Sequence, residues 1–238
     1  FNPELVDQFL RICAELPANF LKKVIEEKFI KQKQNWLRLM SSFSPYGFEY
    51  AKMFEILYKA GEISSLLKLA EIVLAAKSKK ELEEKTIKFG GTEFPTGIDN
   101  PFYFNNTSYI KVFDYLAKIE DEKYIKKAFE LVAKTMTQVI EVSKKEDRDE
   151  PFAVYDFLLL IDEDFFEIDL KERTRTFRQN AANLAAVMKI LAERFITRYC
   201  KSKPAKAKEF FNKYIGAFDD SKSPLPDCRT MWRFRLFV

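Results

Sequence analysis

Apolar residues recur at intervals of three and four positions along almost the whole chain, and this spacing constrains its fold more than any other feature. It is the period of one face of an α-helix, whereas a half-buried strand alternates at every second residue. The pattern therefore predicts an all-α protein. We expect helices over residues 3–16, 18–42, 46–60, 62–77, 79–88, 107–119, 121–145, 151–161, 171–201 and 204–217.

Proline and glycine mark the ends of these expected helices. Pro3 and Pro45 follow Asn and Ser, which cap helix N-termini, and proline is favoured in the first helical turn because no N–H is needed there. Gly61, within the sequence YKAGEISSLL, predicts the end of one helix and the start of the next. A connection this short places the two helices antiparallel, as a helical hairpin.

The hairpin around Gly61 is similar to a second stretch of the chain. When Tyr50–Leu74 is placed on Tyr109–Ala133 without gaps, eight of the 25 positions are identical. Hairpins that each carry one apolar face bury it by stacking on one another. The sequence therefore predicts an α-solenoid of stacked antiparallel helical hairpins of the HEAT or armadillo kind. The alternative is a chance similarity between two Lys-rich amphipathic helices.

We expect residues 1–238 to form a single helical-repeat domain. The longest break in periodicity, residues 89–106, contains three Gly and two Pro, and a subdivision of the domain would fall there. A long connection between repeats is our preferred interpretation, because similar helices are expected on both sides. The start at Phe1 and the apolar ending MWRFRLFV predict a fragment of a larger chain.

Histidine is absent from the chain, and this excludes whole classes of chemistry. Ser-His-Asp and Cys-His mechanisms need an imidazole, as do most catalytic zinc sites and haem sites. The acidic stretch that begins at Asp162 has Glu167 where an EF-hand loop needs glycine. We therefore expect no enzyme, no catalytic or metal-binding residues and no cofactor, with carboxylate or Lys chemistry as the alternative.

The cysteines bear on location. Cys13, Cys200 and Cys228 are odd in number, widely separated and in no CxxC arrangement. This usage predicts buried, small apolar residues rather than disulfide partners or metal ligands, and a cytoplasmic location. No charge-free apolar run approaches the roughly 18 to 20 residues that span a bilayer, so we expect no membrane partner.

Charge is distributed unevenly, although the net charge is only +4. Residues 1–170 carry 24 basic and 30 acidic side chains, whereas residues 171–238 carry 16 basic and 6 acidic ones. A basic surface attracts phosphate backbones or an acidic protein. Alternatively, it is a solvated helix face or contacts the acidic part of the same chain. The candidate contacts to nucleic acid or to an acidic partner are Arg173, Arg175, Arg178, Arg194, Arg198, Lys201 and Lys206.

Three stretches resemble a known kind of protein. They are ELPANFLKKVIEEKFIKQKQNWL, MFEILYKAGEISSLLKLAEIVLAA and RTRTFRQNAANLAAVMKILAERF. Together they resemble the helical-repeat regions downstream of the ATPase in bacterial STAND-type (NACHT-like) proteins. The resemblance implies a sensor or scaffold arm of a larger protein, with anti-phage defence as its setting. It carries no nucleotide activity and no functional residue to this chain, because a Walker motif is missing.

The sequence thus predicts a non-enzymatic helical-repeat scaffold or sensor arm that binds a protein or peptide partner and leaves its oligomeric state open. A wide surface of stacked hairpins and the lack of any catalytic constellation are the reasons. The alternative is a nucleic-acid-binding helical repeat whose basic C-terminal third follows a phosphate backbone.

Overall fold

The computed structural model describes residues 3–39, 47–74, 86–89, 92–95, 111–145 and 184–216, with the separate positions 224–225, 231, 234–235 and 238. Its helices are α1 (Pro3–Cys13), α2 (Ala18–Val24), the π-helix η1 (Ile25–Ile30), α3 (Lys33–Leu39), α4 (Gly47–Lys59), α5 (Ile63–Val73), α8 (Glu122–Lys145), α12 (Leu184–Ser202) and α13 (Pro204–Tyr214). Residues 111–117 form a further helical segment. Strands β1 (Thr86–Phe89) and β2 (Thr92–Pro95) pair with each other.

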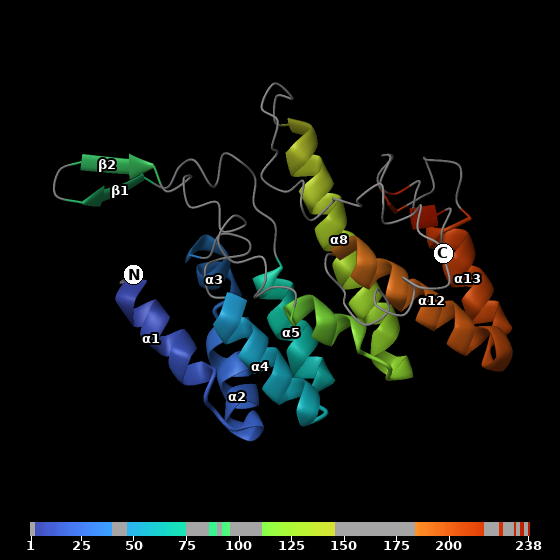
Figure 1. The fold of residues 1–238 in the computed structure, drawn as a ribbon, viewed down its shortest axis with the longest axis horizontal. Coiled ribbons are helices and arrows are strands. Elements are labelled where there is room, and N and C mark those ends of the chain that lie inside the picture. Colours follow the sequence, from blue (N-terminus) through green and yellow to red (C-terminus); the bar gives the residue numbers. More distant parts are fainter. Residues whose placement is uncertain are drawn as a thin grey trace, which may run out of the picture.

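The helices follow one another along the long axis of the molecule, from α1 at one end to α13 at the other (Figure 1). Helix α4 packs against α1, α2 and α5, while α5 also contacts η1, α3 and α8. Helix α12 packs between α8 and α13. Elements that are close in sequence are therefore neighbours in space. The all-α class predicted from periodicity is confirmed for the helical body of the described chain.

Apolar side chains from all of these helices join into one contiguous core. The bulkiest of its fully buried members are aromatic: Tyr50, Phe29, Phe54, Phe113 and Phe129. Each is at most 1% exposed. Burying apolar surface stabilises a fold by roughly 25 cal/mol per Å², so each of these large rings contributes substantially to the packing of the helices.

Gly61 ends α4 as the sequence predicts. Its φ angle is +71°, in the left-handed region that favours glycine. The N–H of Glu62 donates to the carbonyl of Leu57 at 2.9 Å, and the N–H of Gly61 donates to that of Tyr58 at 3.0 Å. These two bonds form the Schellman motif, which satisfies the last carbonyls of a helix. Helix α5 then starts at once and packs against α4.

The single helix predicted over residues 18–42 is wrong. The structure divides this segment into α2, the π-helical turn η1 and α3, with a turn at residues 31–32. The wider turn leaves Ile25 and Phe29 buried. The indole Nε1 of Trp36 reaches back and donates to the carbonyl of Lys28 at 2.6 Å. Burial of these apolar side chains and this hydrogen bond override the regular helical period.

A second correction concerns the β-hairpin. Residues 86–88 were expected at the end of a helix over 79–88, and residues 92–95 in a loop, but both segments are strands. They pair antiparallel, with Phe89 opposite Thr92 and Thr86 opposite Pro95. Thr86, Ile87 and Thr92 are β-branched, which favours strands, and a Gly-Gly dipeptide separates the two segments in the sequence, as two-residue hairpins prefer.

The remaining predicted helices agree with the structure wherever it describes them. Helices α1, α4, α8, α12 and α13 fall within or beside their predicted ranges, and the segment at 111–117 falls within 107–119. The helix predicted at 151–161 and the first part of that at 171–201 lie outside the described residues. Among the helices that the structure describes, none combines the length and apolar character of a membrane span.

The cysteine prediction is confirmed at one position and wrong at another. Cys13 is buried in the core at the end of α1, and burial raises the pKa of its thiol to about 12. Cys200 is exposed on α12. Both are free thiols. Cys228 lies outside the described residues.

Candidate functional site

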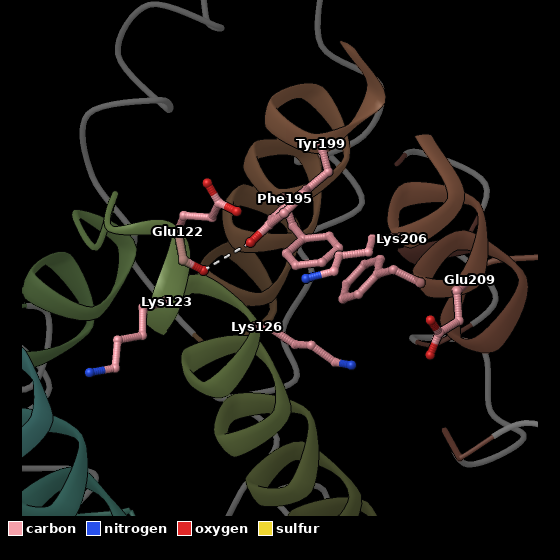
Figure 2. Close-up of a pocket in the computed structure, with 8 residues that line it drawn as sticks. Glu122, Lys123, Lys126, Phe195, Tyr199, Lys206 and Glu209 are labelled. Carbon is pink, nitrogen blue, oxygen red and sulfur yellow. Dashed lines mark hydrogen bonds between the residues drawn. The ribbon is translucent and has the colours of Figure 1, made fainter. Parts of the chain in front are cut away.

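A pocket of about 270 Å³ opens where α8, α12 and α13 meet (Figure 2). Its wall combines aromatic side chains with Lys and Glu side chains. The residues that line it are Glu122, Lys123, Lys126, Phe195, Tyr199, Lys206, Glu209 and Phe210. Five of these residues are charged and three are aromatic, so the hollow is more polar than an ordinary small-molecule site, whose lining is mostly apolar.

Two local sequence features place the elements around this pocket. The backbone N–H of Lys123 donates to the Asp121 carboxylate at 2.8 Å, which caps the start of α8. Lys203 separates α12 from α13, and Pro204 stands in the first turn of α13, where its missing N–H has no cost. Because this connection is so short, α13 folds back against α12.

The pocket has an aromatic floor, formed by Phe195 and Tyr199 of α12 and Phe210 of α13. These three residues are each no more than 5% exposed. The ring of Phe195 lies 4.4 Å from that of Phe210 and 4.4 Å from that of Tyr199, between centroids. Phe210 also meets Phe129 of α8 edge-on at 4.8 Å. Such pairs contribute roughly 0.5–1.5 kcal/mol each beyond their buried area, so packing holds the floor in place.

Glu122, the first residue of α8, interacts with Tyr199 of α12 and with Lys203, which connects α12 to α13. Its carboxylate forms an ion pair with Lys203 at 2.6 Å, and its backbone carbonyl accepts a hydrogen bond from the Tyr199 hydroxyl at 3.2 Å. The hydrogen bond from Lys203 lowers the pKa of Glu122, and the Tyr199 side chain adds to this shift. Glu122 is therefore ionised at neutral pH, and its charge is balanced by Lys203.

Two lysines supply positive charge at the opening, Lys126 from α8 and Lys206 from α13. Both side chains extend into the gap between these helices, whereas that of Lys123 turns away from it (Figure 2). The ammonium of Lys206 lies 5.7 Å from the centroid of the Tyr199 ring, a cation–π distance. Within the described part of the chain, no salt bridge involves Lys126 or Lys206.

The basic residues that we predict from the sequence as candidate contacts have different environments in the structure. Arg194 donates through Nη1 to the carbonyls of Ala117 and Ile119, the second at 2.9 Å. Arg198 donates to the carbonyl of Glu120 at 2.6 Å. Lys201 is exposed on α12 and Lys206 lines the pocket. Arg173, Arg175 and Arg178 lie outside the described residues.

Arg194 thus binds the end of the helical segment at 111–117 and a residue just beyond it, whereas Arg198 binds the connection that leads to α8. The last carbonyls of a helix have no partner within it, and a cation is favoured there by the helix dipole. Further along, Tyr214 of α13 donates from its hydroxyl to the carboxylate of Glu130 at 3.1 Å. For these residues, the basic C-terminal third contacts the preceding part of the same chain, which is one of the alternatives that the charge pattern left open.

Sequence reasoning named only Lys206 among the residues that line the pocket. Phe195 and Phe210 read as ordinary core positions of two amphipathic helices, and the contact between them depends on the angle at which α13 turns back. One sequence feature could have indicated the pocket. The spacing of Tyr199, Lys203 and Lys206 places an aromatic ring and two cations on successive turns around Pro204. Lys126 carried no signal of its own.

Within the described ranges, no three Cys, Asp or Glu side chains are grouped as ligands for a metal ion. Comparison of the chain with family models, curated proteins and solved structures found no match.

Proposed function

We propose that this protein is a non-enzymatic helical-repeat scaffold or sensor arm that binds a protein or peptide partner. The observation that carries the proposal is the pocket between α8, α12 and α13, which combines a packed aromatic floor with two lysines that form no salt bridge in the described chain. The three rings are core residues that support the hollow from below, and the lysines at its opening are the groups that a partner would meet first.

The repeat part of the proposal has its own support. Helix α5 starts at Ile63 and α8 starts at Glu122, which is the same shift of 59 residues that relates the two similar stretches of sequence. At that shift, eight of the eleven buried residues in 52–74 fall on buried residues, and five of these pairs follow. The pairs are Phe54 and Phe113, Leu57 and Leu116, Leu66 and Ile125, Leu69 and Ala128, and Val73 and Val132. Contact between α5 and α8 is the contact that stacked hairpins make.

The nucleic-acid alternative has less support. Arg194 and Arg198, two of its expected phosphate contacts, already bond to backbone carbonyls. Single-stranded nucleic acid also needs aromatic faces on which bases stack. Here Phe195 stacks on Phe210 and lies tilted against Tyr199, so its ring is already in contact with two others. Nucleic-acid binding remains the second prediction, and weak, non-specific binding that disappears with added salt is what we expect of it.

The resemblance to helical arms of STAND-type proteins places this activity within a larger protein. In that setting, the partner would be a component that the arm senses or holds. Defence against phage is the setting that this resemblance implies. The structure supports only the binding of a partner, through the charge and shape of the pocket.

Selection of peptides from a displayed random library against the purified chain tests the proposal. We expect enriched peptides to bind reversibly and to slow amide hydrogen exchange at the start of α8 and at the corner between α12 and α13. Peptides that fail to enrich, or that protect none of these amides, would contradict the assignment of a partner to this pocket. Thymidine oligonucleotides that give the same protection would favour the second prediction.

A further inference from the structure

We infer that the pocket between α8, α12 and α13 recognises an acidic segment of its partner, with one bulky apolar side chain of that segment inserted above the aromatic floor. This inference rests on the proposed function and specifies its partner. Three properties of the pocket carry it: the balance of charge, the size of the hollow and the occupied faces of its rings.

The charge at the opening favours a carboxylate. Of the two lining acids, Glu122 forms an ion pair with Lys203 at 2.6 Å. The other, Glu209 of α13, forms no ion pair in the described chain, and its carboxylate points away from Lys126 and Lys206 (Figure 2). Lys126 and Lys206 extend into the gap from two facing helices (Figure 2). Their ammonium groups form no salt bridge within the described ranges, although the charge of Lys206 helps to lower the pKa of Glu122. A segment with carboxylates on both sides of its anchor would place one near each lysine, and opposite charges of this kind set the specificity of an interface.

The size and lining favour a single apolar anchor. A volume of about 270 Å³ lies just below the range of small-molecule sites, about 300–1,000 Å³. Phe195 and Phe210, each 3% exposed, form the floor, and the alkyl stems of Lys126 and Lys206 add apolar surface at the sides. One Phe or Leu side chain meets apolar surface on each of these sides, while the main chain of the segment stays at the rim.

The same rings disfavour a nucleobase. Stacking needs an open ring face, and the rings of the floor are at most 5% exposed. The ring of Tyr199 lies within cation–π distance of Lys203 and Lys206, at 5.6 and 5.7 Å. An apolar side chain can instead pack against the alkyl stems of Lys126 and Lys206 at the sides of the hollow. The pocket therefore suits an acidic peptide better than a single-stranded nucleic acid.

Fluorescence anisotropy with defined probes tests this inference on the full chain. The first probe is a short fluorescein-labelled peptide rich in Glu and Asp, with one central Phe. Its controls replace the acids with Lys, or the Phe with Ala, and a thymidine oligonucleotide of similar length is the nucleic-acid probe. We expect the first probe alone to bind at physiological salt.

Charge reversal then locates the site. Lys126→Glu and Lys206→Glu are each expected to weaken the acidic probe about tenfold or more. The matched controls are Lys134→Glu on α8 and Lys208→Glu on α13, both exposed and outside the lining. They change the net charge equally and should alter affinity less than about twofold. Lys126→Gln and Lys206→Gln replace any reversal variant whose circular dichroism spectrum differs from that of the parent.

The outcomes separate the inference from the function on which it rests. Equal weakening by the pocket variants and by their controls would overturn the inference, as would unchanged affinity for the Ala peptide. Binding of the oligonucleotide with the same dependence on Lys126 and Lys206 would overturn it in favour of nucleic acid. If library peptides protect the pocket but carry no excess of acids, only this inference fails. If no peptide protects the pocket, the proposed function fails with it.

Discussion

Arg194 of α12 donates a hydrogen bond to the backbone carbonyl of Ile119, 2.9 Å away in space and 75 residues away in sequence. The same Nη1 also bonds to the carbonyl of Ala117. One guanidinium therefore satisfies two carbonyls at the end of the helical segment before α8. This contact fixes α12 relative to the start of α8, and with it two of the three walls of the candidate site.

Replacement of Arg194 by Leu should lower the free energy of unfolding by about 1–3 kcal/mol, because two partly buried carbonyls lose their donor. Urea denaturation followed by circular dichroism measures the change. Arg198→Leu is the control, since its single bond to Glu120 is exposed and should contribute less than about 1 kcal/mol. Equal losses in the two variants would contradict a structural role specific to Arg194.

Trp36 should stabilise the packing of α3 against η1 through both its ring and its N–H. Its ring stacks on Phe29 at 4.5 Å, and its Nε1 donates to Lys28. Trp36→Phe keeps a stacked ring and should cost about 1–2 kcal/mol for the lost hydrogen bond. Trp36→Ala removes both and should cost about 3–5 kcal/mol. The same loss in both variants, measured by urea denaturation, would show that the hydrogen bond alone matters.

Gly61 should tolerate Asn better than Ala. Nothing lies within 4 Å of the position that a Cβ would occupy, so the whole effect comes from the φ angle of +71°. Gly61→Ala should lower the midpoint of thermal unfolding, with a loss of about 1–2 kcal/mol. Gly61→Asn should lose less, because Asn enters the left-handed region more readily. A neutral effect of Ala would mean that the turn adopts another conformation.

The two described cysteines should differ sharply in reactivity towards a thiol reagent. Burial raises the pKa of Cys13 to about 12, whereas Cys200 is exposed. In a Cys228→Ser background at pH 8, we expect one thiol to react quickly and the other only after unfolding. Cys200→Ser should remove the fast phase. The raised pKa also stabilises the fold fully below the unfolded value near 9, and this contribution is lost as the pH rises towards 12.

Glu122 should titrate below an ordinary Glu as long as Lys203 is present. Its lowered pKa gives a contribution to stability that is present above the unfolded pKa and lost as the pH falls through the folded one. Lys203→Gln should raise the pKa of Glu122, as measured by carboxyl ¹³C chemical shifts. Lys201→Gln removes the same charge from an exposed position of α12 and should leave that pKa nearly unchanged. Equal shifts would show that net charge, and not the ion pair, controls Glu122.

The candidate site was only partly predictable. The basic character of the C-terminal third is visible in the composition, yet the same charges serve different purposes. Arg194 and Arg198 bond to carbonyls between the helical segment at 111–117 and α8, while Lys206 faces a pocket. Composition records how many charges a segment carries, but the partner of each charge depends on contacts across some 75 residues of sequence. Lys126 became a candidate only because α13 folds back opposite α8.

Local chemistry determined much of the fold in advance. Apolar spacing predicts the helices, and Gly61 predicts the turn between α4 and α5, because helical period and left-handed φ are properties of a few adjacent residues. Long-range packing decided the rest. The division of residues 18–42 around η1 follows from burial of Ile25 and Phe29 and from the reach of Trp36 to Lys28. The pocket exists because a short corner at Pro204 sets the angle between two helices, and such an angle is fixed only when their side chains pack.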